Sequence, residues 1–196
     1  MKKYELTKET IEVDGRTLHR IVALKSFADV KEGDLGGYVE SESNLSHYGE
    51  CWIYGDARVG GSARVGGYAR VVGDACVGGS ACVVGSARVG GSACVGGYAC
   101  VGGYARVGGD ACVGGYACVV GDARVEGDAR VESVRDIFIC QNAISSGRSI
   151  TYTRSNQRWV TGCFSGSGKE LIDKSYQDSD EKGKWFEKLV QFVENL

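Results

Sequence analysis

The chain has 196 residues, of which 31 are glycine and none is proline, and its formal net charge is −2. This near-neutral balance argues against a nucleic-acid or anionic-membrane partner, and no apolar run approaches the roughly 20 residues needed to cross a bilayer. The N-terminal segment MKKYELTKET has no apolar stretch after its lysines and so does not resemble a signal peptide. Without a secretion signal, the nine cysteines predict free thiols in the reducing cytoplasm.

Residues 1–43 are predicted to form a small β-rich cap. Lys3 to Val13 and Thr17 to Leu24 have the residue pattern of strands, and Asp14-Gly15 between them is typical of a hairpin turn. A cap is expected here because the next segment is a repeat array, whose open end would expose unpaired strand edges.

Residues 44–133 are dominated by a six-residue repeat, Ala-(Arg/Cys)-Val-x-Gly-(Asp/Ser/Tyr). Alanine recurs at every sixth position from Ala57 to Ala129, and valine follows two residues later each time, from Val59 to Val131. A period this regular indicates a solenoid, in which each repeat packs on its neighbours.

The repeat predicts short strands joined by corners. Alanine and valine are separated by one residue, so both point to the same side of an extended strand, here the interior. The x-Gly pair suits a corner, since glycine tolerates backbone conformations that other residues avoid. Two looser hexads come first, with Leu45 and Cys51 in the alanine phase and His47 and Ile53 in the valine phase. With three hexads in each coil, the segment is predicted to be a parallel β-helix of about five coils.

Residues 134–196 are predicted to be an α+β module. Three segments have strand-like patterns: Asp136 to Ala143, Ser149 to Thr153 and Arg158 to Thr161. Glu170 to Tyr176 is predicted as a short helix and Glu181 to Leu196 as an amphipathic one. The apolar stripe of the second helix consists of Phe186, Leu189, Val190 and Val193. The module is expected to cap the solenoid, and binding of a partner is the alternative.

Two resemblances to known proteins support this organisation. Written from valine, the hexad Val-Gly-Gly-Ser-Ala-Arg (Val59 to Arg64) resembles the aliphatic-small-x-x-small-x motif of the hexapeptide-repeat family. That resemblance implies a left-handed β-helix, and the best-known members of the family are trimeric acyltransferases. The flanking segments, Arg20 to Tyr38 and Trp159 to Gly166, resemble those of phage and prophage hexapeptide-repeat proteins. This second resemblance implies a phage or prophage origin and a binder or inhibitor of a host protein.

Residues three hexads apart are expected to lie directly above one another. The outward Arg/Cys position then forms three columns, one on each face of the solenoid. The columns are Arg58, Cys76, Cys94, Cys112, Arg130; then Arg64, Cys82, Cys100, Cys118; and finally Trp52, Arg70, Arg88, Arg106, Arg124. Cysteine therefore predominates on two faces and arginine on the third.

The cysteine columns predict a packing surface and no metal site. Tetrahedral zinc needs four ligands around one point, and three thiols in a straight column on a flat face do not surround an ion. Disulfides along a column are disfavoured, because aligned Cβ atoms stay near the strand spacing of about 4.8 Å while a bridge needs about 3.8 Å. Free cysteine behaves as a small apolar residue. Cys82, Cys100 and Cys118 are therefore expected in the interface of a homodimer or homotrimer, with exposed inert thiols as the alternative.

The arginine column marks the predicted site for a protein partner. The residues expected to bind are Tyr68, Arg70, Arg88, Tyr104, Arg106 and Arg124. Arginine and tyrosine are enriched in the hot spots of protein interfaces; the alternative is a solvated face with splayed arginines. Nucleic acid fits less well, because acidic residues equal arginines in number from Asp56 to Glu132 and no lysine occurs there.

A non-catalytic interaction or scaffold protein is the expected function, and an acyltransferase using an acyl-coenzyme A donor is the alternative. Hexapeptide-repeat acyltransferases typically use a histidine base beside the coils, whereas His19 and His47 both precede the regular repeats. No inserted loop interrupts the repeats to form a substrate pocket. Cys163 lacks a nearby base. We therefore expect no catalytic residue, no cofactor and no metal.

Overall fold

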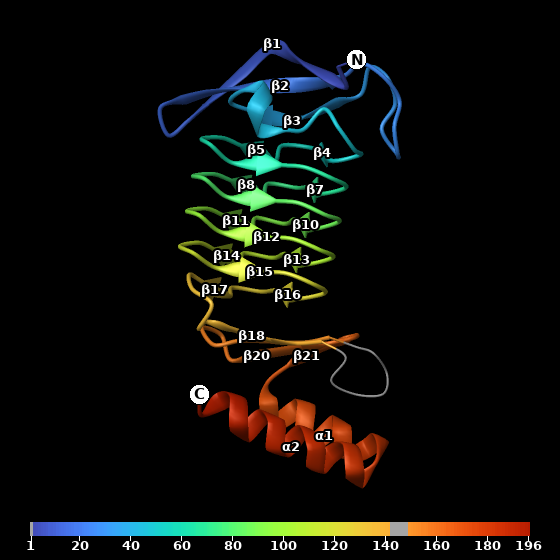
Figure 1. Ribbon diagram of the computed structural model, residues 1–196, viewed down its shortest axis with the longest axis vertical. Coiled ribbons are helices and arrows are strands. Elements are labelled where there is room, and N and C mark those ends of the chain that lie inside the picture. The colour runs from blue at the N-terminus through green and yellow to red at the C-terminus, as the bar shows by residue number, and fades with distance from the viewer. Residues whose placement is uncertain (1, 142–148) are drawn as a thin grey trace.

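The computed structural model describes residues 2–141 and 149–196. A stack of coils lies between an N-terminal sheet and a C-terminal part that holds a four-stranded sheet and two helices (Figure 1). The coils make about five turns of a parallel β-solenoid, so the predicted mainly β architecture is confirmed. In the described part of the chain, neither helix has the length and apolarity that crossing a bilayer requires.

The N-terminal part is a three-stranded sheet that continues into the solenoid. It consists of β1 (Tyr4–Val13), β2 (Arg16–Ala23) and β3 (Leu35–Val39). The turn between β1 and β2 is the predicted one, and both Asp14 and Gly15 have positive φ there. β3 was not predicted. It pairs in parallel with the first strand of the coil below, through Tyr38 opposite Arg58 and Val39 opposite Val59.

Three parallel sheets form the three faces of the solenoid. The first face continues β3 with β5 (Arg58–Val59), β8 (Cys76–Val77), β11 (Cys94–Val95), β14 (Cys112–Val113) and β17 (Arg130–Val131). The second face holds β6 (Arg64–Val65), β9 (Cys82–Val83), β12 (Cys100–Val101) and β15 (Cys118–Val119). The arginine face holds β4 (Trp52–Ile53), β7 (Arg70–Val71), β10 (Arg88–Val89), β13 (Arg106–Val107) and β16 (Arg124–Val125).

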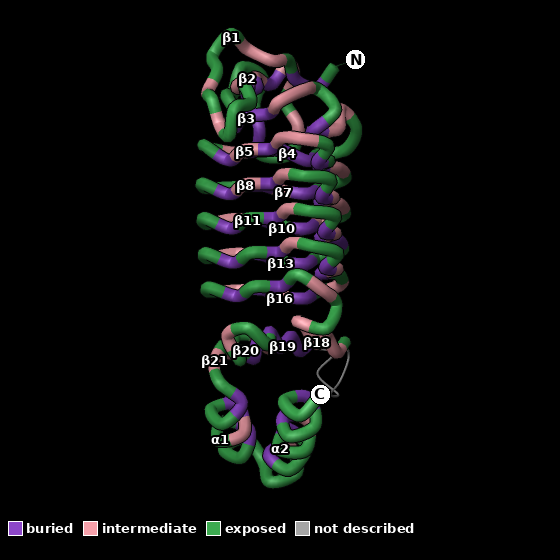
Figure 2. The backbone as a smooth tube through the Cα atoms, turned by 90° about the vertical axis from the view of Figure 1, so that its left-hand side faces the viewer, coloured by how far each residue is buried: buried purple, intermediate pink, exposed green. Residues whose placement is uncertain are grey.

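The core of the solenoid is the predicted alternation of alanine and valine. Every repeat alanine and valine from Ala57 to Val131 is at most 2% exposed. Figure 2 shows these buried positions recurring coil after coil. Since small and medium side chains fill a narrow interior, each coil buries its apolar residues only when another coil lies above or below it.

The corners depend on glycine in the left-handed backbone region. At Gly103, φ is +66°, and an added Cβ would lie 2.9 Å from both the backbone nitrogen and the carbonyl oxygen of Gly121 in the next coil. A side chain here would meet both an unfavourable backbone conformation and the neighbouring coil.

The first coil departs from the predicted register. Leu45 bridges Val65, and Trp52 pairs with Arg70, so the first coil has two more residues between these points than the coil below. Leu45 therefore occupies a valine position, and the expectation that it shares the alanine phase is wrong. His47 does not occupy a valine position either; its ring stacks on Tyr4, with centroids 4.4 Å apart.

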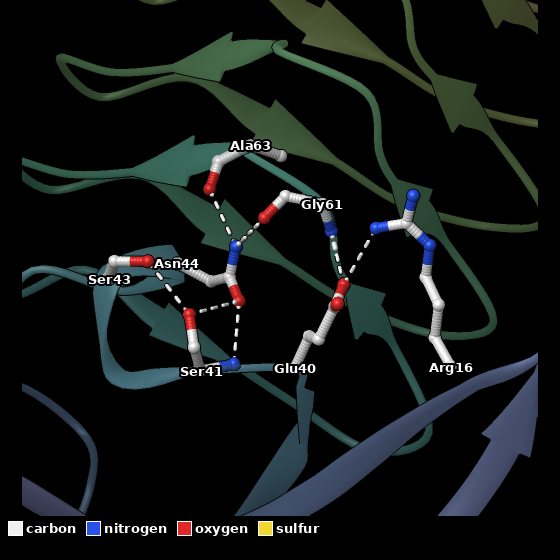
Figure 3. A network of polar contacts seen from close by, with 7 residues as sticks. All are labelled: Arg16, Glu40, Ser41, Ser43, Asn44, Gly61 and Ala63. Atoms are coloured by element: carbon white, nitrogen blue, oxygen red, sulfur yellow. Dashed lines mark hydrogen bonds and ion pairs between the residues drawn. The ribbon is translucent and has the colours of Figure 1, made fainter.

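A polar network replaces the missing repeat contacts at this irregular coil (Figure 3). The side-chain amide of Asn44, which is fully buried, donates to the carbonyl oxygens of Gly61 (3.0 Å) and Ala63 (2.9 Å). Its oxygen accepts from the backbone N–H of Ser41 at 2.8 Å. The Glu40 carboxylate accepts from the backbone N–H of Gly61 at 2.6 Å and pairs with Arg16 at 2.8 Å. These bonds join the N-terminal part to the first regular corner.

The C-terminal part is an antiparallel meander followed by a helical hairpin. Its strands are β18 (Ile137–Cys140), β19 (Ile150–Thr153), β20 (Arg158–Thr161) and β21 (Phe164–Gly166). β21 was not predicted, and positions 142 and 143 of the strand expected from Asp136 to Ala143 lie outside the described residues. The buried side chains of Trp159 and Phe186 belong to one cluster that joins sheet and helices.

Both helices begin earlier than predicted, because each has a serine N-cap. Helix α1 spans Gly168–Asp178 and is capped by Ser167, which exchanges hydrogen bonds with Glu170 in a capping box. Helix α2 spans Asp180–Glu194 and is capped by Ser179. On the predicted apolar stripe of α2, Phe186, Val190 and Val193 are buried and Leu189 is half-buried.

Candidate protein-docking site

The arginines of the arginine face are stacked in register. Arg70 lies opposite Arg88, Arg88 opposite Arg106, and Arg106 opposite Arg124. This confirms the predicted column. The four side chains nevertheless have different surroundings, which divide the column into two ends and a middle.

The upper end of the column is tied to the N-terminal part. The Arg70 guanidinium pairs with both carboxylate oxygens of Asp29, which lies between β2 and β3, at 3.0 and 3.1 Å. The Tyr54 hydroxyl donates to the same carboxylate at 2.8 Å. The bond from Tyr54 and the charge of Arg70 hold the pKa of Asp29 below its ordinary value. Burial and the bond to Asp29 raise the pKa of Tyr54 to about 12. Arg70 is thus engaged within the chain.

The lower end is tied to the C-terminal sheet. Nη1 of Arg124 donates to the carbonyl oxygen of Gly162 at 2.7 Å, and its backbone N–H donates to Oγ1 of Thr151 at 3.0 Å. Gly162 lies in the turn between β20 and β21. Arg124 therefore helps to seat the C-terminal sheet on the last coils, and the prediction that it forms part of a shared docking surface has no support in its contacts.

The middle of the column faces a groove of about 290 Å³. The residues that line it are Glu50, Tyr68, Arg70, Ser86, Arg88, Tyr104 and Arg106. Arg88 and Arg106 are exposed, and neither forms an ion pair or a side-chain hydrogen bond with residues 2–141 or 149–196. The rings of Tyr68 and Tyr104 are 58% and 69% exposed. This groove combines two unpaired guanidinium groups with two accessible aromatic rings.

The structure therefore brings five of the six predicted docking residues together and leaves out Arg124. Glu50 and Ser86 also line the groove and were not among the predicted docking residues, and Glu50 is the charged one. Glu50 lies three hexads before Tyr68. Residues three hexads apart were expected to lie directly above one another, so the same expectation would have placed Glu50 in the coil above Tyr68. Its carboxylate places a negative charge at the upper edge of the groove.

The second face differs in chemistry. Cys82, Cys100 and Cys118 lie in register and are half-buried. Tyr98 and Tyr116 stack beside them, with ring centroids 5.2 Å apart and planes 5° apart. Burial and the neighbouring thiols raise the pKa of Cys100. The predicted role of this face in self-association stays a prediction.

The two histidines and Cys163 lie outside the regular repeats, and His47 belongs to the irregular first coil. His19 contacts the carbonyl oxygen of Thr7 at 3.3 Å, and His47 accepts from the backbone N–H of Lys3 at 3.3 Å. Cys163 is exposed in the turn before β21. Within the described residues, no three His, Cys, Asp or Glu side chains are arranged to hold a metal ion.

Comparison with known proteins gives one partial similarity. No protein-family model matches the chain. It is 37% identical over 62 residues to a protein of Escherichia coli (strain K12) described as the uncharacterized acetyltransferase YdcK. The match covers 28% of this chain and 19% of that protein, so it spans less than a fifth of the relative. Neither comparison supports a phage or prophage origin.

Proposed function

We propose that the chain is a non-catalytic interaction protein that binds an acidic segment of a partner protein along the arginine face. The observation that carries this proposal is the groove in which Arg88 and Arg106 are stacked, exposed and unpaired, between two arginines that are already engaged. Unpaired like charges at strand spacing repel one another, and a partner that supplies carboxylates would remove that repulsion.

A helix with glutamates on one stripe fits the spacing of this column. Side chains at i and i+4 of a helix are about 5–6 Å apart at Cβ, close to the strand spacing of about 4.8 Å. A guanidinium group binds a carboxylate through two parallel hydrogen bonds. The exposed rings of Tyr68 and Tyr104 add apolar contact area. Because the coils are held by hydrogen bonds above and below, binding would order few residues of this chain.

The test is a fluorescence anisotropy titration with a labelled helical peptide that carries glutamate at every fourth position. We expect the peptide to bind the wild-type protein, and a peptide with glutamine at the same positions to bind at least tenfold more weakly. The double variant Arg88→Glu/Arg106→Glu should lose tenfold or more in affinity, since truncated hot-spot residues each cost roughly 1–3 kcal/mol.

The matched control is Arg64→Glu/Arg135→Glu, which makes the same change of charge at exposed arginines outside the groove. An equal loss in both variants would mean that net charge alone governs binding. Full affinity of the Arg88→Glu/Arg106→Glu variant would show that the arginine face is not the docking surface. A deletion of residues 134–196 that alone abolishes binding would place recognition in the C-terminal part.

An acyltransferase is the second candidate, favoured by the description of the partial relative as an acetyltransferase. It predicts that coenzyme A raises the melting temperature by several degrees, because a ligand stabilises the fold that binds it. It also predicts turnover of acetyl-coenzyme A with an amine acceptor. The docking proposal predicts neither effect, so a thermal shift assay with coenzyme A separates the two.

A further inference from the structure

The cysteines of the first face form a column of three thiols with a common orientation. Cys76 lies opposite Cys94 and Cys94 opposite Cys112 in adjacent parallel strands. Each thiol contacts the backbone carbonyl two residues before it, at 3.7, 3.8 and 3.9 Å respectively. All three are free, and Cys94 and Cys112 are exposed. The side chains therefore repeat with the spacing of the strands.

The middle thiol lies in register between its two neighbours. The pKa of Cys94 is raised, first by burial and then by the thiols of Cys76 and Cys112 above and below it. The column thus offers two adjacent thiol pairs that share one member. Arg58 and Arg130 occupy the same position in the coils beyond, so the thiols end there.

This geometry suits an ion that takes two ligands on opposite sides. A zinc–thiolate bond is about 2.3 Å long, and two bonds of that length in line would span about 4.6 Å, close to the strand spacing of about 4.8 Å. The argument against zinc, which needs four ligands around one point, does not apply to such an ion. Soft cations such as Cu(I) are the ones that thiolates select.

We propose that the column of Cys76, Cys94 and Cys112 binds a soft monovalent cation, Cu(I) or Ag(I), between adjacent thiolates. The two thiols of a pair release their protons to water, each sulfur donates a lone pair to the cation, and no oxidation or reduction occurs. The exposed side chains of Asp74 and Asp110 lie on the same face and supply negative charge nearby. On the second face, the position two residues before the cysteine is held by Tyr98 and Tyr116 in two of the coils. The three thiols of that face are all half-buried.

Two serine variants separate a paired site from a simple count of thiols. Cys94→Ser removes the middle thiol and leaves no adjacent pair on the first face, whereas Cys76→Ser removes one thiol and keeps the pair of Cys94 and Cys112. The experiment is an anaerobic titration of the full chain with Cu(I) against a coloured Cu(I) chelator, with circular dichroism melts to show that each variant folds. We expect Cys94→Ser to lose at least tenfold in Cu(I) affinity relative to Cys76→Ser.

Cys100→Ser on the second face is the positional control and should retain the wild-type affinity. Equal losses in Cys94→Ser and Cys76→Ser would overturn the proposal, because binding would then follow thiol number. If Cys100→Ser lost as much Cu(I) affinity as Cys94→Ser, the assignment of the site to the first face would be overturned. A wild-type protein that withdraws no Cu(I) from the chelator would also overturn it, and native mass spectra with Ag(I) provide a second measurement of the same difference.

Discussion

Arg70 and Asp29 form a two-bond ion pair that joins the arginine face to the N-terminal part, with nitrogen–oxygen distances of 3.0 and 3.1 Å. The two residues are far apart in sequence and come from different kinds of structure, a repeat strand and an irregular loop. Tyr54, in the coil above Arg70, completes the contact with its own hydrogen bond to Asp29. The pair therefore contributes to capping the solenoid.

Asp29→Asn should weaken this cap in a pH-dependent way. The folded-state pKa of Asp29 is lowered, so its contribution to stability is present above the unfolded pKa and is lost as pH falls through the lowered value. The side chain of Asp29 is 54% exposed, so the expected loss at pH 7 is at most about 1 kcal/mol. Urea unfolding at pH 7 and at about pH 3 measures it. An undiminished difference at the acid pH would contradict the ion-pair interpretation.

Asn44→Asp should lower the free energy of unfolding more than Asp29→Asn does, because Asn44 is fully buried. The substitution replaces the NH₂ group that donates to the Gly61 and Ala63 carbonyl oxygens with an oxygen that repels them. Each buried group left without its partner costs about 1–3 kcal/mol. Burial would raise the pKa of the new carboxyl group in the folded state, so the loss should be larger at pH 7 than at pH 4.

Ser43→Ala serves as the control for this coil. Its hydroxyl contacts only the Ser41 hydroxyl among the described residues, and that contact is exposed. The free energy of unfolding should change by no more than about 0.5 kcal/mol. If Asn44→Asp were as mild as Ser43→Ala, the network of Figure 3 would not be what holds the first coil in place.

The coils could be predicted from the sequence because every hexad repeats the same short strand and corner. A strand position, an inward alanine and valine, and a corner glycine recur with one period, and stacking in register follows from it. The arginine and cysteine columns were predicted for the same reason. Sequence periodicity predicts contacts only where a coil packs on a neighbouring coil that has the same repeat.

The ends could not be predicted in the same way. β3 contains two adjacent glycines and has low intrinsic strand propensity, yet it forms because the first coil offers it an unpaired edge. The contacts of Arg70 with Asp29 and of Arg124 with Gly162 join repeat residues to non-repeating segments. No periodic pattern specifies such pairs, so the sequence predicted the column and could not predict which of its arginines bond within the chain.

Gly103→Ala should destabilise the protein far more than Gly102→Ala. At Gly103 an added methyl group would lie 2.9 Å from the Gly121 backbone, and the left-handed conformation itself costs about 1–2 kcal/mol for a residue with a side chain. At Gly102 the added carbon would meet valine methyl groups at 3.7 Å, an ordinary contact. Urea unfolding should show a loss above about 1 kcal/mol for the first variant and none for the second. Equal losses would contradict the corner argument.

Self-association through the second face is the remaining prediction. From Ser80 to Val120 every outward side chain on this face is uncharged, and it presents the stacked Tyr98 and Tyr116 beside the cysteine column. A contiguous apolar patch of this kind is typical of surfaces that another chain covers. The triple variant Cys82→Arg/Cys100→Arg/Cys118→Arg should therefore reduce the mass measured by light scattering to that of a monomer.

The fold itself should tolerate three arginines in one column, because the arginine face already holds four in register at the equivalent position. A loss of mass in the triple variant would then report a broken interface, and an unchanged circular dichroism melt would confirm that the coils are intact. The matched control places arginine at Cys76, Cys94 and Cys112, which adds the same charge to the first face. If both variants lower the mass equally, repulsion between highly charged chains explains the result. If the wild-type protein is a monomer at tens of micromolar, the second face is not an interface.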